Sequence, residues 1–232
     1  MSRQRPKRRF SKKIVVFCEG QTEKHYLNGL KKWLSERDPS ITVRIEPVDM
    51  KGGGYDAALR KLRIEPDSNC IARLVVMDFD RYLDIPSERI AFGQLVQFSQ
   101  LSMSRQIPTV LVISNANFEY ALCCHDPIYR GEDPSSFLKK EWGYGTLGDV
   151  KADDRIWGKA HEGERSHEGA MKVLSERPAL ISNELKIKKS AHSISLSKVS
   201  FNEENTSVRS SNLSDLFKVL MFDEGVAFFS GV

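Results

Sequence analysis

The 232-residue sequence predicts an α/β fold: a central, mostly parallel sheet flanked by helices, with a smaller, mainly helical C-terminal region. Short apolar runs alternate three times with amphipathic helical patterns over about the first 110 residues. That order is typical of parallel strands joined by right-handed helical crossovers. Several of the apolar runs end in acidic or polar residues. In such a sheet the carboxyl ends of the strands form the edge where ligands bind.

The first strand and helix are expected over roughly residues 13–37. An apolar run, Ile14–Cys18, leads into an acidic turn at Glu19 and Gly20. Helical spacing follows at once, and its apolar positions are Tyr26, Leu27, Leu30, Trp33 and Leu34. Alternating apolar and polar residues then predict a half-exposed second strand over Ile41–Val48.

A glycine run, Gly52-Gly53-Gly54, follows Lys51 and precedes a helix expected from about Tyr55 to Arg63. Such a run could present backbone N–H groups to a phosphate. It lacks the Lys-Ser/Thr pair that a phosphate-binding P-loop requires, which favours a strand-to-helix connection.

The third strand, Ala72–Met77, is apolar apart from Arg73, as expected for a strand that is covered on both faces. A helix is expected to begin near Pro86 and to carry an apolar stripe to about Arg105. The fourth strand is Thr109–Ile113, which ends in Ser114-Asn115. A short helix should then carry Phe118, Glu119, Ala121 and Leu122.

The pattern weakens after His125. Residues 126–168 are rich in glycine and charged residues and predict one short helix, near Ser135–Lys140. Further helices are expected near Glu168–Glu176 and Asn212–Phe222, whereas Ser193–Phe201 fits either a strand or a loop. We therefore divide the chain into a basic flexible arm (1–12), an α/β domain (13–125) and a helical or irregular region packed on that domain (126–232).

One glycine pattern is misleading. Gly143–Gly148 matches the G-x-G-x-x-G spelling of a dinucleotide-binding loop. That loop needs a strand before it and a helix after it, and charged sequence flanks the pattern on both sides. We reject a dinucleotide site here.

The positive charge is concentrated at the N-terminus. The chain has a formal net charge of +4, yet its first 13 residues contain seven basic residues and no acid. These are Arg3, Arg5, Lys7, Arg8, Arg9, Lys12 and Lys13. Such an arm can bind nucleic acid through its phosphates, or it can be a solvated tail. The rest of the chain is mildly acidic.

Composition argues against a membrane or secreted protein. No apolar run approaches the roughly 20 residues that cross a bilayer. The basic N-terminus lacks the apolar segment of a secretory signal. The four cysteines, Cys18, Cys70, Cys123 and Cys124, lack disulfide-like spacing, so we expect reduced thiols and a cytoplasmic protein.

Carboxylates at two strand ends predict a cation site. Asp78 and Asp80 follow the third strand, and on an extended strand end they would point to one side, about 7 Å apart. Glu19 follows the first strand, beside Gly20, which allows a sharp turn. Mg²⁺ prefers oxygen ligands and usually takes one or two carboxylates, with water and phosphate in its other positions. The alternative is that all three acids are solvated turn residues.

The same residues resemble a known family. Phe17-Cys18-Glu19-Gly20-Gln21-Thr22-Glu23, with Tyr26-Leu27, resembles the opening motif of RloB-like proteins. These belong to the wider Toprim group, which includes OLD-family nucleases, primases and topoisomerases. Asp78-Phe79-Asp80 resembles that group's D-x-D, and Ser114-Asn115 with Phe118-Glu119, Leu122 and His125 resembles a later family segment. Asn205-Thr206-Ser207-Val208 is faintly similar to the family's closing motif.

The resemblance implies a Toprim-like Rossmannoid fold, bound Mg²⁺ or Mn²⁺, and nuclease action in antiviral defence. By position, Glu19 matches the general acid/base or metal ligand, and Asp78 and Asp80 match the metal-binding pair. Glu23 and Glu119 match further acids of the motifs, the second in a supporting role. The sequence departs from the family at Ala116-Asn117 and at Tyr120–Cys124, which puts substrate range in doubt.

Other chemistries have less support. His125, His161 and His167 with Cys123-Cys124 suggest zinc, but zinc ligands usually show tighter spacings. No G-x-S-x-G elbow occurs, so a serine hydrolase is not expected. Lys186, Lys188 and Lys189 form a second basic cluster that fits a phosphate backbone or a solvated face.

Two functions therefore remain. The first is a metal-dependent nuclease that hydrolyses phosphodiester bonds of DNA or RNA. The second is a catalytically silent subunit that binds nucleic acid or a partner within a defence complex. The expected partners are nucleic acid, an ATPase or another defence-system protein, and a second copy of the chain, without a membrane.

Overall fold

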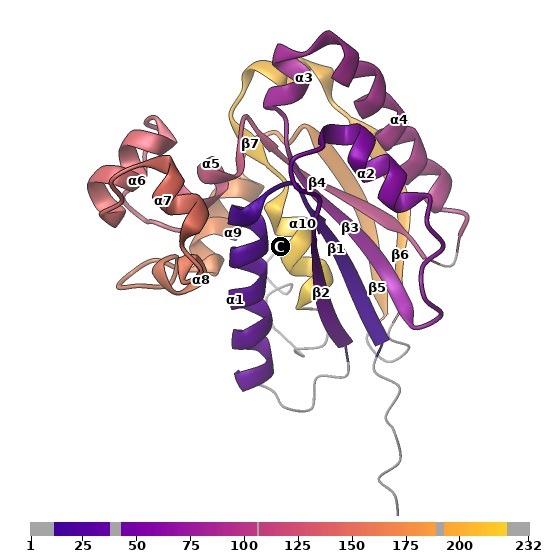
Figure 1. The fold of residues 1–232 in the computed structure, drawn as a ribbon, viewed down its shortest axis with the longest axis horizontal. Coiled ribbons are helices and arrows are strands. Elements are labelled where there is room, and N and C mark those ends of the chain that lie inside the picture. The colour runs from indigo at the N-terminus through magenta and orange to yellow at the C-terminus, as the bar shows by residue number, and fades with distance from the viewer. Residues whose placement is uncertain (1–11, 38–42, 106, 189–192, 222–232) are drawn as a thin grey trace, which may run out of the picture.

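The computed structural model describes residues 12–37, 43–105, 107–188 and 193–221 (Figure 1). Its main sheet has the strand order β2-β1-β3-β4-β7. Strands β1 (Lys12–Cys18), β2 (Val43–Asp49), β3 (Cys70–Asp78) and β4 (Thr109–Asn115) are parallel, and β7 (Ser210–Ser211) pairs antiparallel with β4. The predicted α/β fold with a mostly parallel sheet is confirmed.

Helices cover both faces of this sheet (Figure 1). Ile14, Val16, Leu74 and other inward residues of one face pack with α1 (Gln21–Arg37) and α10 (Leu213–Leu220). The alternate positions, such as Phe17 and Val75, pack with α2 (Gly54–Leu62) and α4 (Pro86–Ser102). This period-two division is why these strands contain continuous apolar runs, at residues 14–18 of β1, 74–77 of β3 and 110–113 of β4.

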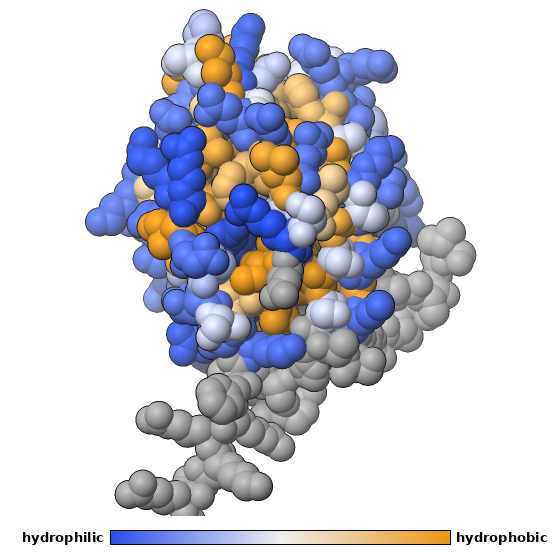
Figure 2. Space-filling model, turned by 90° about the vertical axis from the view of Figure 1, so that its right-hand side faces the viewer, coloured by the Kyte–Doolittle hydropathy of each residue, from blue (hydrophilic) through white to orange (hydrophobic). Residues whose placement is uncertain are grey.

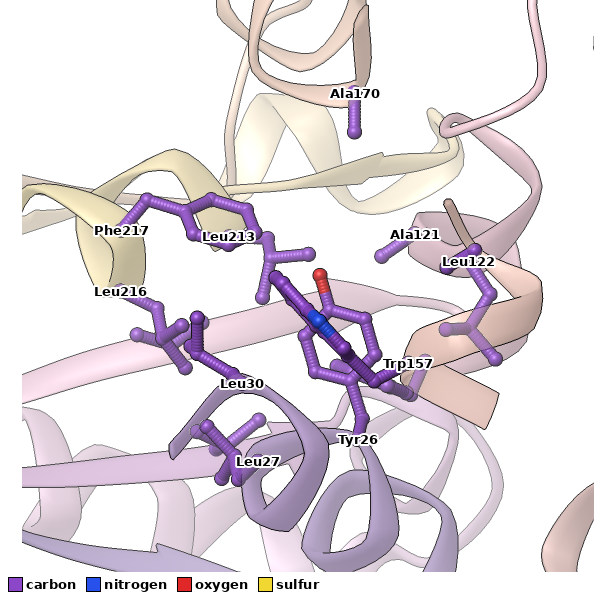
Figure 3. Close-up of a cluster of buried hydrophobic side chains, with 14 of the residues drawn as sticks. Tyr26, Leu27, Leu30, Ala121, Leu122, Trp157, Ala170, Leu213, Leu216 and Phe217 are labelled. Atoms are coloured by element: carbon purple, nitrogen blue, oxygen red, sulfur yellow. The ribbon is translucent and has the colours of Figure 1, made fainter. Parts of the chain in front are cut away.

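Helix α1 is fixed to the rest of the chain by aromatic packing (Figure 3). The Tyr26 ring lies edge-on to Trp157 of α8 (Ile156–Lys159), with ring centroids 5.0 Å apart. Phe118 of α5 (Phe118–Cys123) lies edge-on to the same ring at 5.4 Å. Phe217 of α10 is fully buried beside this group. The first helix thus packs against elements more than 90 residues away in sequence.

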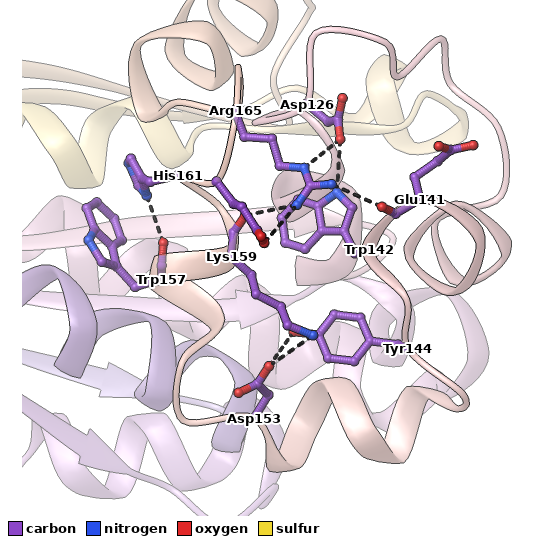
Figure 4. Close-up of polar contacts among 10 residues, drawn as sticks. Asp126, Glu141, Trp142, Tyr144, Asp153, Trp157, Lys159, His161 and Arg165 are labelled. Carbon is purple, nitrogen blue, oxygen red and sulfur yellow. Dashed lines mark hydrogen bonds and ion pairs between the residues drawn. The ribbon is translucent and has the colours of Figure 1, made fainter.

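The segment with weak sequence signals folds as short helices around one arginine. It contains α6 (Pro134–Trp142), α7 (Leu147–Ala152), α8 and α9 (His167–Ser175). Arg165 Nε donates to Asp126 Oδ2 at 2.8 Å, and its Nη2 donates to the Glu141 carbonyl at 3.0 Å (Figure 4). Trp142 Nε1 donates to the same Asp126 oxygen at 3.1 Å. Polar contacts therefore supplement a small apolar core here.

The C-terminal region contains more strand than predicted. Ser193–Phe201, for which strand and loop were both open, is β6, and it pairs antiparallel with β5 (Ile181–Lys188). Together with β7, these strands add a small antiparallel hairpin and a short edge strand to a region whose other described elements are helices. Hairpin residues 181–188 pack beside the outer edge of β4, where Asn183 Nδ2 donates to the Leu111 carbonyl at 2.8 Å. Asn212 bonds the same carbonyl and the Ile113 N–H, so side-chain amides cap this sheet edge.

The other predicted connections and helices occur in the structure, together with several short helices that were not predicted. The glycine run connects β2 to α2 as expected, and the helices expected near residues 86, 135, 168 and 212 are α4, α6, α9 and α10. Gly143 ends α6 with φ at 74°, and no strand precedes it, which agrees with rejecting the dinucleotide loop. Helices α3 (Asp80–Asp84), α7 and α8 and the 3-10 helix η2 (Glu203–Ser207) were not predicted. Three predicted parts lie outside the described residues: residues 1–11 of the arm, residues 41–42 of the second strand and residue 222 of the last helix.

Two simpler expectations concern cysteines and membrane spans. All four cysteines are free and buried. In the described ranges, no helix combines the length and apolarity needed to cross a bilayer.

Candidate functional site

The ends of the first and third strands meet, as the sequence predicted. Strands β1 and β3 are neighbours, and Cys18 pairs with Val76. The Glu19 N–H donates to the Val76 carbonyl at 3.1 Å. Glu19 Oε2 in turn accepts from the Asp78 N–H at 3.0 Å. The side chain of one predicted site residue is therefore bonded to the backbone of another, 59 residues later.

Two further acids approach from helix N-termini. Glu23 lies in the first turn of α1, is only 4% exposed, and accepts from the Gly20 N–H at 3.2 Å. A Cβ on Gly20 would lie 3.3 Å from that carboxylate, so glycine permits the close approach. Glu119 lies in the first turn of α5 and is 6% exposed. Helix N-termini favour negative charge, which helps to keep such buried acids in place. We call Glu19, Glu23, Asp78, Asp80 and Glu119 the carboxylate cluster.

The acids of the carboxylate cluster perturb one another. Burial raises the pKa of Asp78 well above its usual value, and Glu23, Glu19, Glu119 and Asp80 raise it further. Burial also raises the pKa of Glu19, although the Asp78 N–H opposes this change. The pKa of Glu23 is raised to about 7, first by burial and then by Glu19 and Glu119. Burial likewise raises the pKa of Glu119. Glu19, Glu23, Asp78 and Glu119 therefore hold protons more tightly than separate carboxylates would.

The expected geometry of the D-x-D segment is wrong. Asp78 ends β3, but Phe79 adopts helical backbone angles (φ −98°, ψ −6°), and Asp80 begins α3. The two acids are thus not on an extended strand end. The Phe79 side chain is fully buried, which turns the chain over the sheet edge. Asp78 points into the protein, whereas Asp80 is exposed. The pair combines one buried and one solvent-facing carboxylate.

A layer of polar contacts supports the cluster. Tyr55 Oη donates to the Asp78 carbonyl at 2.9 Å, and the Tyr55 N–H donates to Glu88 Oε2 at 3.1 Å. Glu88 also accepts from Arg81 Nη2 at 2.8 Å. Gly54 has φ at 63°, and a Cβ there would lie 2.5 Å from Glu88 Oε1. These residues link α2, α3 and α4 beneath the cluster, and no motif or spacing in the sequence indicated them.

The segment at the end of β4 contacts two other parts of the chain, the start of α3 and residues 205–208. The Phe79 and Asp80 N–H groups donate to the Ala116 carbonyl at 3.0 and 3.2 Å. Asn115 Nδ2 donates to the carbonyls of Thr206 at 2.9 Å and Val208 at 2.7 Å. Two segments about 90 residues apart in the sequence thus meet at the edge that carries the carboxylate cluster.

One observation supports the binding of a cation at the carboxylate cluster. Asp78 Oδ1 is buried and has no hydrogen-bond partner, although a buried carboxylate oxygen normally has one. Among the described residues, no three histidine, cysteine, aspartate or glutamate side chains are grouped as a ready metal site. Mg²⁺ does not require such a cage, since it is usually held by one or two carboxylates, water and substrate phosphate. Glu19, Asp78 and Asp80 are the residues that fit this role.

Neither a protein-family model nor a curated protein matches the chain.

Of the basic residues predicted to bind nucleic acid, only Lys12 and Lys13 belong to the described residues. Lys12 begins β1, at the opposite end of that strand from Glu19. Lys13 Nζ forms ion pairs with Glu46 Oε2 at 3.0 Å and with Asp67, and its role in nucleic-acid binding stays a prediction. Arg3, Arg5, Lys7, Arg8 and Arg9 lie outside the described residues. Lys186 and Lys188 are exposed on β5, and Lys189 lies outside the described residues.

The histidines considered for zinc form other contacts. His125 Nε2 lies 2.8 Å from Tyr26 Oη, and its Nδ1 lies 3.2 Å from the Ala121 carbonyl. His161 Nε2 lies 2.9 Å from His167 Nδ1. Cys123 Sγ lies 3.7 Å from the Pro134 carbonyl. Burial lowers the pKa of His125 to about 3, so this ring is neutral at pH 7. His125 thus joins α1 to the end of α5, whereas the other contacts join α8 to α9 and α5 to α6.

The raised pKa of Glu23 predicts a pH-dependent stability. The folded chain holds the Glu23 proton up to about pH 7, whereas an unfolded glutamate loses it near pH 4.5. The metal-free protein should therefore lose stability as pH rises through this window, by on the order of 3 kcal/mol at most. Glu23→Gln keeps an acceptor for Gly20 and removes the titration. Urea unfolding between pH 4.5 and 8 should show the wild type falling relative to this variant.

The matched control is Glu164→Gln, which changes an exposed acid. Its stability profile should run parallel to that of the wild type, because the buried histidines affect both proteins equally. A parallel profile for Glu23→Gln would contradict the raised pKa.

Proposed function

We propose that this chain is a metal-dependent, Toprim-type nuclease that hydrolyses phosphodiester bonds of DNA or RNA. The observation that carries the proposal is the contact between Glu19 Oε2 and the Asp78 N–H, 3.0 Å apart at the carboxyl edge of the sheet. It brings together acids from two strand ends, beside the buried and unbonded Asp78 Oδ1. Ligand sites of open α/β sheets occur at this edge.

Each acid of the carboxylate cluster would have its own role in the reaction. Glu19, Asp78 and Asp80 would hold Mg²⁺ or Mn²⁺, which supplies charge neutralisation and polarises a phosphate oxygen. Glu19 is partly buried with a raised pKa, which suits a group that accepts a proton from an attacking water near neutral pH. Glu23 has a pKa of about 7 and suits a proton reservoir beside it. Glu119 adds negative charge and acts in support.

The biological setting is part of the proposal. The sequence resemblance to RloB-like proteins supports a role in defence against phage or foreign DNA, alongside an ATPase or another defence protein. The four free, buried cysteines are consistent with a cytoplasmic protein.

The second candidate is a catalytically silent subunit that binds nucleic acid or a partner. One observation favours it: the described residues contain no ready group of three metal ligands. In that case the raised pKa values of Asp78 and Glu23 would lower the cost of burying these acids without a metal.

One experiment separates the two candidates. The full chain is incubated with plasmid, single-stranded DNA and tRNA in Mg²⁺, Mn²⁺ or EDTA, and Mn²⁺ alone is titrated into it by calorimetry. The nuclease is expected to bind Mn²⁺ and to cleave at least one substrate only with metal present. Substrate binding without cleavage in every condition, together with no Mn²⁺ binding, would establish the silent subunit instead.

A further inference from the structure

A pocket lies apart from the carboxylate cluster, where α2 and α4 end. It has a volume of about 580 Å³, and its wall includes Arg63, Arg73, Phe98 and Arg105. Small-molecule sites commonly have this size. Arg73 pairs with Thr109, the first residue of β4, and lies five positions before Asp78. At about 3.3 Å per residue, the pocket is roughly 17 Å along β3 from the cluster. We call it the arginine pocket.

Arg73 is an unusual side chain for the interior of a sheet. It is only 4% exposed, and its Nη1 donates to the Leu62 carbonyl at 2.8 Å. Its guanidinium lies over the Phe98 ring, 5.6 Å from the centroid. These contacts hold the group in one orientation at the end of α2. Its Nε is buried and has no hydrogen-bond partner. The helix-end contact therefore uses only part of the guanidinium.

A second arginine shares the same aromatic ring. Arg105 also lies over Phe98, again 5.6 Å from the centroid. Within the described part of the chain, neither Arg73, Arg105 nor the adjacent Arg63 forms an ion pair with a carboxylate. The described residues of the pocket wall include these three arginines and a single acid, Glu65. Like charges held together beside an apolar wall repel, and an anion in the pocket would offset that repulsion.

The surface around the pocket is mixed in character. Figure 2 faces the side of the molecule on which α4 ends, where strongly hydrophilic side chains lie directly against hydrophobic ones. Leu62, Ile64 and Ile107 contribute apolar surface to the pocket wall. Ile64 is 64% exposed, which is high for a large apolar residue. A ligand that matches this wall carries negative charge at one end and an apolar or planar group at the other.

We propose that the arginine pocket binds a phosphate monoester with a planar or apolar organic group. Guanidinium groups bond phosphate oxygens in pairs, and a pre-oriented arginine loses little freedom when it does so. Arg73 and Arg105 would bind the phosphate from β3 and from the turn after α4, and the organic group would lie on the apolar wall. A helix-capping role for Arg73 explains one N–H and leaves the second arginine and the open volume unexplained. This site is independent of the proposed nuclease activity.

The test is binding of phenyl phosphate to the full chain, measured by calorimetry. Saturable binding is expected, tighter than for inorganic phosphate or phenol alone. Arg105→Gln is expected to weaken it at least about 10-fold, because one charged pair of bonds is lost. Arg89→Gln is the matched control: Arg89 is exposed on α4, and its guanidinium also lies 5.6 Å from a ring centroid, that of Tyr82. Binding to this variant should equal that of the wild type.

A second variant guards against an effect on folding. Ile64→Glu changes an exposed wall residue and introduces a negative charge, so it should also abolish binding while the melting temperature stays unchanged. The proposal is overturned if the wild type shows no saturable binding, or if Arg89→Gln weakens binding as much as Arg105→Gln. Equal affinity for phenol would overturn the phosphate assignment.

Discussion

Asp78→Asn is expected to abolish metal-dependent cleavage and at the same time to stabilise the metal-free protein. The side chain keeps its size, but it loses a charge that burial and four neighbouring acids all disfavour. Loss of a group that stabilises charge at the reacting centre commonly reduces turnover by roughly 100- to 1,000-fold. A stabilised but inactive variant is the signature of a functional site whose residues conflict with folding. Cleavage rates in Mg²⁺ and melting temperatures in EDTA measure the two effects.

The control for this variant is Asp84→Asn, which changes an exposed acid at the end of α3. It carries the same change in charge only six residues away and should leave both cleavage and melting temperature unchanged. Full activity in Asp78→Asn would remove this residue from the proposed reaction. A lower melting temperature in EDTA would mean that the carboxylate stabilises the fold, in conflict with its raised pKa.

The central sheet and the position of Glu19 and Asp78 were predictable for one reason. Strands covered on both faces are apolar throughout, so β3 and β4 can be recognised without knowing their neighbours. Parallel strands end at the same edge, and the acids that follow β1 and β3 must then lie at that edge. The 3.0 Å contact between Glu19 Oε2 and the Asp78 N–H is the result.

Other parts of the site depend on contacts that local patterns do not encode. Asp80 was expected on a strand, yet burial of Phe79 turns the chain there into α3. Tyr55 and Glu88 support the cluster from α2 and α4 through bonds across 23 and 33 residues. Nothing in their spacing distinguishes them from ordinary helix residues.

The arrangement of the C-terminal region also depends on contacts that local sequence patterns do not encode. Helices α7 and α8 have six and four residues, too short for a clear periodic signal. Their arrangement depends on Arg165, which bonds to Asp126 from 39 residues away. Strand β5 alternates buried and exposed positions, but the buried Asn183 interrupts the apolar face and weakens the alternating pattern.

Gly29→Ala is expected to destabilise the protein by about 3 kcal/mol, although alanine is the better helix former. Gly29 lies within α1 where this helix crosses α8. A Cβ at this position would lie 2.2 Å from Trp157 Cβ and 2.8 Å from Trp157 Cγ. A Cβ cannot rotate away as the end of a long side chain can, so the two helices must separate. Urea unfolding gives the loss of stability directly.

Gly93→Ala is the matched control, because it makes the same substitution inside another helix, α4. A Cβ there would meet nothing within 4 Å, and the position is exposed. Without a clash, helix propensity should decide the outcome and stabilise the protein by roughly 0.5 to 1 kcal/mol. Opposite signs for the two variants would establish that the α1–α8 contact is as close as described. Equal stabilisation would mean that α1 does not pack on Trp157. The helix that carries Glu23 at its start would then lack the anchor that positions this acid in the carboxylate cluster.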